Sequence, residues 1–132
     1  MREYACQQTA LLLERMTLAL QKAGEGDADS IHDVRVAMRR LSGCLRVFAP
    51  FYPDGAAKKI RRRISALMAL AGAARDCDIS IELVNRSGVG QRGAIVAQLA
   101  ERRIEAGRAL LHEVRRWKRH DYLRQWRKRL EL

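Results

Sequence analysis

Basic side chains recur along one strip of the segment from Asp27 to Phe48. A helix turns by about 100° per residue, so residues three, four or seven positions apart stack on one side of it. That spacing joins four residues, which are His32, Arg35, Arg39 and Arg46. Guanidinium groups present a planar fork of N–H donors that matches phosphate oxygens. The strip therefore predicts a basic groove for phosphate, although an ordinary solvated helix face also carries rows of charge.

The same segment has the pattern of an amphipathic helix over residues 27–48. Its apolar residues fall into one stripe, made of Ile31, Val34, Met38, Leu41, Leu45 and Phe48. Asp27 or Asp29 can cap its start, and acidic residues suit the first turn of a helix. Pro50 limits its far end. We therefore expect the basic strip on the flank of a buried stripe, where neighbouring helices can wall it in.

Two motifs of this chain resemble those of the CHAD family, whose name stands for conserved histidine α-helical domain. The family has a His-x-x-Arg-Val-x-x-Arg-Arg-Leu helix, which here reads His32, Arg35, Val36, Arg39, Arg40 and Leu41. Its second element, Gly-Pro-Ala-Arg-Asp-Leu-Asp-Val, corresponds to residues 72–79, with the sequence GAARDCDI. The order and spacing of both motifs match, and a weaker resemblance covers nearly all of the chain.

The resemblance implies a function. Family members are all-helical and bind inorganic polyphosphate in a basic channel, often beside triphosphatase-like domains. We therefore expect a polyphosphate-binding module that is not an enzyme and needs no cofactor or metal. Its phosphate contacts would be His32, Arg35, Arg39 and Arg46, with Arg40, Arg62, Arg75 and Arg103 as neighbours. Because histidine gains charge in mild acid, His32 would strengthen binding as the pH falls.

Two other functions remain open from the sequence. One is a helical domain that binds nucleic acid, for which the basic runs near the C-terminus, 115–120 and 127–129, are the first place to look. The other is an accessory module to an enzyme that metabolises polyphosphate or triphosphate. Autonomous catalysis is not expected, because no cluster of acidic residues faces the basic strip to hold Mg²⁺.

The chain departs from the family in length and in single residues. A complete CHAD domain has two four-helix halves around one channel, and this chain matches only the first half. A twofold homodimer would restore the channel, and a long exposed apolar patch would support it. The Arg that often follows the family's Arg-Arg-Leu is Ser42, the family's Pro is Ala73, and Tyr122 alone is kept from a C-terminal Ser-Pro-Arg-Tyr-like element.

Composition indicates one domain, residues 1–132, with a polyanionic partner. The chain has 26 basic and 15 acidic residues, a formal net charge of +11, and most of the basic residues are Arg. Such a balance favours polyphosphate, nucleic acid or another polyanion. A hydrophobic content of 48% fits a folded globule, and 5% aromatic residues leaves few platforms for stacking bases.

Three cysteines, Cys6, Cys44 and Cys77, show no Cys-x-x-Cys spacing. This odd number predicts reduced thiols and neither a zinc site nor a disulfide framework. The sequence shows no apolar run long enough to span a membrane and no signal-peptide core at its start. The expected location is the cytoplasm, with association with polyphosphate granules as a further possibility.

The fold class expected from these patterns is all-α, an antiparallel four-helix bundle with short connections and a short extra C-terminal helix. We expect Asp54 to cap the third helix, Gly72 to kink the chain, and Asp121 to cap the last helix. A plain loop is expected at 85–93. The other helices are expected at 3–23, 55–71, 76–84 and 91–117.

Several charged residues keep two interpretations. Cations crowd the start of the third helix at 58–63, where they oppose the helix dipole, so either a nearby anion or plain solvent screening compensates them. Arg103 falls inside an apolar stripe, so it either pairs with Asp76 or Asp78 or lines the phosphate groove, and the groove is slightly favoured. The two aspartates are expected to be structural, capping their helix and pairing with an Arg of the 27–48 helix.

Overall fold

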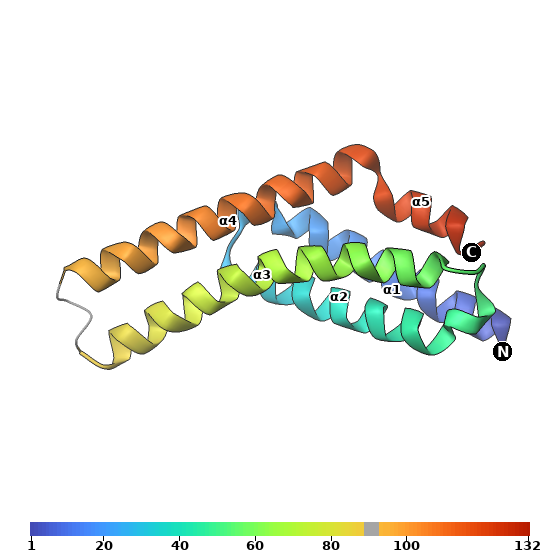
Figure 1. The fold of residues 1–132 in the computed structure, drawn as a ribbon, viewed down its shortest axis with the longest axis horizontal. Coiled ribbons are helices and arrows are strands. Elements are labelled where there is room, and N and C mark those ends of the chain that lie inside the picture. Colours follow the sequence, from blue (N-terminus) through green and yellow to red (C-terminus); the bar gives the residue numbers. More distant parts are fainter. Residues whose placement is uncertain (89–92) are drawn as a thin grey trace.

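The computed structural model describes residues 1–88 and 93–132, and these residues form helices and no strand. The α-helices are α1 (Arg2–Lys22), α2 (Ala28–Phe48), α3 (Ala56–Arg86), α4 (Ala94–His120) and α5 (Tyr122–Arg129), with short 3-10 helices η1 (Ala23–Glu25) and η2 (Ala49–Phe51). The four long helices alternate in direction along the chain (Figure 1). The all-α prediction is confirmed. The predicted loop and the predicted start of the fourth helix fall partly on residues 89–92, outside the described residues.

Helix α2 begins where the sequence predicts. Asp27 is its N-cap, and the backbone N–H of Ser30 donates to Asp27 Oδ2 at 3.2 Å. Hydrogen bonds from the hydroxyl and the backbone N–H of Ser30 hold the pKa of the Asp27 carboxyl below its usual value. The predicted apolar stripe is confirmed, because its first five members are buried and Phe48 packs against the core.

Helix α3 is one continuous helix, so the predicted separate helix over 76–84 is wrong, whereas a kink at Gly72 stays a prediction. A glycine inside a helix costs only about 1 kcal/mol relative to Ala. Several alanines, which are the best helix formers, surround Gly72 and offset that cost. The helix also begins differently from the prediction, because Gly55, with φ 78°, occupies the N-cap and no side chain caps it, including that of Asp54.

Asp121 is the N-cap residue of α5, as predicted, and also the C-cap of α4, but its side chain makes no capping hydrogen bond. Its backbone is left-handed, with φ 51°, which suits the short polar side chain of Asp better than a bulky one. The backbone N–H of Asp121 bonds to Lys118 O and so ends α4. The turn changes the direction of the chain, so that α5 slopes from the tip of α4 toward the start of α3 (Figure 1).

The core is formed where α1, α2 and α3 pack as neighbours, and α4 adds to it mainly along α3. Helix α4 contributes Leu110, Val114 and Trp117, and α5 and its C-cap contribute Trp126 and Leu130. The rings of the two tryptophans meet edge to face, with centroids 5.1 Å apart. Helix α5 is thereby anchored by apolar contacts, although almost all of its other residues are polar or basic.

A buried hydroxyl cluster fixes the η2 turn against α1. Tyr52, which is 5% exposed, donates its hydroxyl to Ala5 O at 3.0 Å. The hydroxyl of Thr9 bonds to the same Tyr52 oxygen, and it lies 3.4 Å from Cys44 Sγ. Burial raises the pKa of the Tyr52 phenol. All three cysteines are free and half-buried.

The far halves of α3 and α4 project beyond α1 and α2 as a two-helix arm, defined as residues 75–88 and 93–106 (Figure 1). None of these residues is buried. The arm exposes four large aliphatic side chains, Ile79, Leu83, Ile95 and Ile104. Neither α1 nor α2 reaches far enough to cover the arm (Figure 1).

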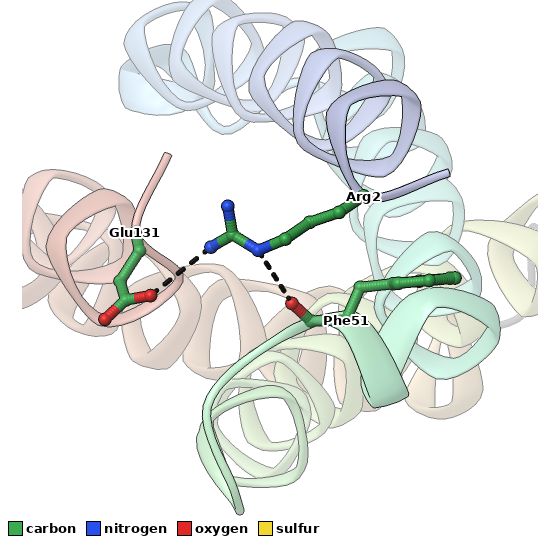
Figure 2. Close-up of polar contacts among 3 residues, drawn as sticks. All are labelled: Arg2, Phe51 and Glu131. Atoms are coloured by element: carbon green, nitrogen blue, oxygen red, sulfur yellow. Dashed lines mark hydrogen bonds and ion pairs between the residues drawn. The ribbon is translucent and has the colours of Figure 1, made fainter.

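At the opposite end of the molecule, Arg2 joins the two ends of the chain (Figure 2). Its Nε donates to Phe51 O, and its Nη2 contacts Glu131 Oε2, both at 3.3 Å. Half of the Arg2 side chain and two thirds of the Glu131 side chain are exposed, so the ion pair itself adds little stability.

Candidate functional site

The basic strip lies on the exposed side of α2. His32, Arg39 and Arg46 are exposed, and only Arg35 is half-buried. Neighbouring helices therefore do not enclose these three residues as predicted, although each of them lines an open groove beside α2. Helix α2 packs between α1 and α3, and the side of α2 that faces away from both helices is open to solvent. Arg35 is the exception, because its Nε is buried and has no hydrogen-bond partner among the described residues.

Two grooves run along the sides of this strip. The α1–α2 groove, of about 410 Å³, brings His32 and Arg40 together with Arg15, Lys22 and Asp33. Its remaining lining residues are apolar, Leu12, Leu18, Ala19, Val36 and Ala37. Arg15 and Lys22 were missed from the sequence. Their separation of seven residues, which places them on one side of α1, is the signal that points to them.

The α2–α3 groove, of about 300 Å³, holds the other half of the strip. Arg39 and Arg46 line it together with Ser42 and Ser65. Gly43, Ile64 and Met68 complete its lining, which includes no acidic residue. Two guanidinium groups and two hydroxyl groups can all donate hydrogen bonds to phosphate oxygens. Ser42, which replaces a basic residue of the family pattern, thus still offers a donor there.

Arg103 is held by protein groups. Its Nε donates to Asp78 Oδ1 and its Nη2 to Gly26 O, each at 2.7 Å. Its Nη1 also lies only 2.6 Å from the place where a Cβ on Gly107 would be, so glycine leaves room for the guanidinium. Of the two interpretations left open, the ion pair with Asp78 is present. The pair ties α3 to α4, so the expectation that Asp78 pairs with an Arg of the 27–48 helix is wrong.

The remaining predicted contacts do not line either groove. Arg62 is exposed near the start of α3, and Arg75 is half-buried where the arm begins. Asp76, expected to cap a helix, is an exposed residue within α3. The structure therefore brings together His32 with Arg40 on one side of α2 and Arg39 with Arg46 on the other.

Residues 1–88 and 93–132 hold no group of three or more His, Cys, Asp or Glu side chains placed to bind a metal ion. The same residues include no helix that is long and apolar enough to cross a membrane.

The structure thus has an all-helical fold in which the basic helix α2 lies between two grooves. The family model described as the CHAD domain matches residues 7–132, so this chain belongs to the CHAD domain family. No curated protein and no solved structure matches the chain.

Proposed function

We propose that this protein binds inorganic polyphosphate, without catalysing a reaction on it, along the exposed strip of α2 and the two grooves beside it. The observation that carries the proposal is the pairing of Arg39 and Arg46 on the α2–α3 groove, which has hydroxyl donors and no acidic lining residue. Membership of the CHAD family supports it, because Arg39 belongs to the family's helical motif. We propose in addition that the protein is located in the cytoplasm, either on polyphosphate granules or away from them.

The shape of the grooves favours a thin ligand. Each groove is open to solvent and lies between two neighbouring helices, α1 and α2 in one case and α2 and α3 in the other. A flexible phosphate chain can lie along either groove. Affinity would come from many charge-assisted hydrogen bonds, and it would fall as salt screens them. Arg15, Lys22 and Arg40 extend the set of cations to the α1–α2 groove.

A competition experiment tests the proposal. The protein is loaded with labelled long-chain polyphosphate at roughly physiological salt, where weak electrostatic binding is screened. Duplex DNA and then RNA are titrated at matched phosphate concentration. We expect neither to displace polyphosphate efficiently, and we expect no phosphate release when Mg²⁺ is added. Ready displacement would show that the strip is a general polyanion surface, and Mg²⁺-dependent phosphate release would identify an enzyme.

We also propose that two copies pair through their arms. The Ile79 and Leu83 side chains, which are four residues apart on α3, are 41% and 61% exposed. Residues 75–105 contain five acidic and five basic residues, so two arms can approach without net charge repulsion. A second copy would cover this surface as a twofold pair, and the strips of the two copies would then belong to one assembly.

Ile79→Glu combined with Leu83→Glu is expected to convert a dimer into a monomer of 15.1 kDa, because burying two carboxylates in the interface is costly. Sedimentation velocity over a range of protein concentrations measures the mass. Val47→Glu is the matched control, because Val47 is 69% exposed and lies on α2. A wild-type chain that remains monomeric, or a control variant that also dissociates, would contradict pairing through the arms.

A further inference from the structure

Most of the excess positive charge of this protein lies outside α2, which holds four basic and two acidic residues. Residues 56–74 hold five basic residues and no acidic one, and residues 115–132 hold eight basic and two acidic residues. The rest of the chain, which includes all of α2, holds thirteen of each kind. The whole net charge of +11 therefore comes from the first turns of α3 and from the C-terminal segment.

These two segments meet at one end of the molecule. The guanidinium carbon of Arg63 lies 4.0 Å from the centre of the Tyr122 ring, which joins α3 to the start of α5. Helix α5 slopes from the tip of α4 toward the beginning of α3 (Figure 1). We call this surface the basic end. Its residues are Lys58, Lys59, Arg61, Arg62, Arg63, Arg115, Arg116, Lys118, Arg119, Arg124, Arg127, Lys128 and Arg129.

The protein itself neutralises little of this charge. All residues of the basic end are exposed except Arg61 and Arg127, which are half-buried. Among the described residues, the ion pairs that involve it are Arg116 with Glu113 at 3.8 Å and Arg127 with Glu14 at 3.9 Å. Both are near the outer limit of an ion pair and partly exposed, so they are weak.

The cations of α3 carry an additional cost. They lie in the first turns of α3, where the helix dipole is positive, and no acidic residue occupies the first turn. Arg61 Nε is also buried without a hydrogen-bond partner in the described part of the chain. By contrast, Lys118 and Arg119 in α4 and the basic residues at 127–129 in α5 lie in the last turns of those helices, where the negative end of the dipole favours them. An anion over the basic end would offset the cost at α3.

We propose that the basic end binds the phosphate backbone of double-stranded nucleic acid without sequence preference. Three helices contribute cations to one broad surface, which suits a wide, rigid polyanion more than a thin chain that fits a groove. A duplex carries one negative charge per about 1.7 Å of its axis, so several cations can each reach a phosphate.

The aromatic residues of this end argue against single strands. Proteins that bind single strands stack bases on exposed aromatic rings. Here Trp117 and Trp126 are 2% and 3% exposed. The half-buried Tyr122 ring already contacts Arg63 and stacks with His120 at 5.4 Å between centroids. The rings of Trp117, Trp126 and Tyr122 are therefore covered by other side chains and are not free to receive a base.

The apolar residues argue against a membrane surface. A helix that lies in a membrane interface inserts exposed Trp, Phe or Leu side chains beside its cations. Within the two basic segments the large apolar side chains face the core, and Leu132, at 37% exposure, is the one exception among those residues. A surface of charge alone fits backbone contacts to a duplex better than insertion into lipid.

The test is anisotropy with a labelled duplex of about 20 base pairs, roughly two helical turns, over a series of salt concentrations. The variant replaces Lys59, Arg119, Arg124 and Arg129 by Gln. If each of these four residues contacts one phosphate, the slope of log affinity against log salt should become shallower by about 3 to 4. The duplex affinity should fall by at least about tenfold. Circular dichroism checks that helix content is kept, and the pair Arg124→Gln and Arg129→Gln provides a milder variant.

The matched control removes four cations from the other surface, by changing Arg15, Arg39, Arg40 and Arg46 to Gln. It should leave duplex binding within about twofold and weaken polyphosphate binding. Equal loss of duplex affinity in both variants would overturn the assignment to the basic end. Equal or tighter binding of a single strand of matched length, or tighter binding of vesicles rich in anionic lipid, would overturn the assignment to a duplex. Because each variant is measured with both ligands, failure of this inference is distinguishable from failure of polyphosphate binding.

Discussion

Replacing Arg39 and Arg46 together by Ala is expected to lower the affinity for long-chain polyphosphate by about a hundredfold at physiological salt. A hydrogen bond to a charged group contributes about 1.5–3 kcal/mol, and the two guanidinium groups would each contact phosphate. A loss of about 3 kcal/mol in total corresponds to a factor of about one hundred. The two residues are seven positions apart, about 10 Å along α2, so one chain can contact both. Isothermal titration with polyphosphate of defined length measures the change.

The control for this variant is Arg86→Ala with Arg102→Ala, which removes the same charge from the arm. Both residues are exposed, and neither lines a groove beside α2. A comparable loss of affinity in this control would mean that net charge, and not the position of Arg39 and Arg46, governs binding. Arg103→Ala gives a second contrast, because it should lower the melting temperature and leave the affinity unchanged.

Tyr52→Phe is expected to reduce the free energy of unfolding by about 1–3 kcal/mol. The change removes the hydroxyl that bonds both Ala5 O and the hydroxyl of Thr9, and it leaves Thr9 buried with one partner fewer. For a domain of this size, a shift in melting temperature of a few degrees follows. Thermal unfolding at neutral pH measures it, with the exposed Tyr4→Phe as the control. An unchanged melting temperature would contradict a role for the hydroxyl cluster in stability.

The same variant should alter the alkaline limb of the stability curve. Burial raises the pKa of Tyr52 above its ordinary value of 10.0. Above that pH the unfolded chain loses the phenolic proton while the folded chain keeps it, so stability falls as the pH rises toward the folded-state pKa. Below pH 10 this contribution is constant. We expect wild-type stability to fall more steeply than that of Tyr52→Phe above pH 10, and parallel curves would refute the assignment.

The sequence predicts the local features of α2 well because they depend on neighbours along the chain. The Asp27 cap and the apolar stripe need only the spacing of residues within one helix. The helix break expected around Gly72 is wrong for the same reason. The effect of this glycine on the helix is small, and whether the helix bends there depends on the packing of α3 and not on the glycine alone.

The parts of the site that escape the sequence depend on contacts between helices. Periodicity places His32 and Arg39 on one side of α2, but it does not say whether a neighbouring helix covers that side. Arg15 enters the site only because α1 packs beside α2. Arg103 contacts Asp78 only because α3 and α4 run side by side, and its second partner, Gly26 O, comes from a distant turn.

The contact of Arg2 with Glu131 has a consequence for how this protein is attached to other molecules. Residues 1 and 132 leave the fold from the same end, where α5 meets the start of α3 (Figure 1). A fluorescent protein, an affinity tag or a surface linker fused at either terminus would therefore sit near the basic end and away from the arm. An acidic linker would compete there with a nucleic acid, whereas immobilisation through a terminus would leave the arm free to meet a second copy.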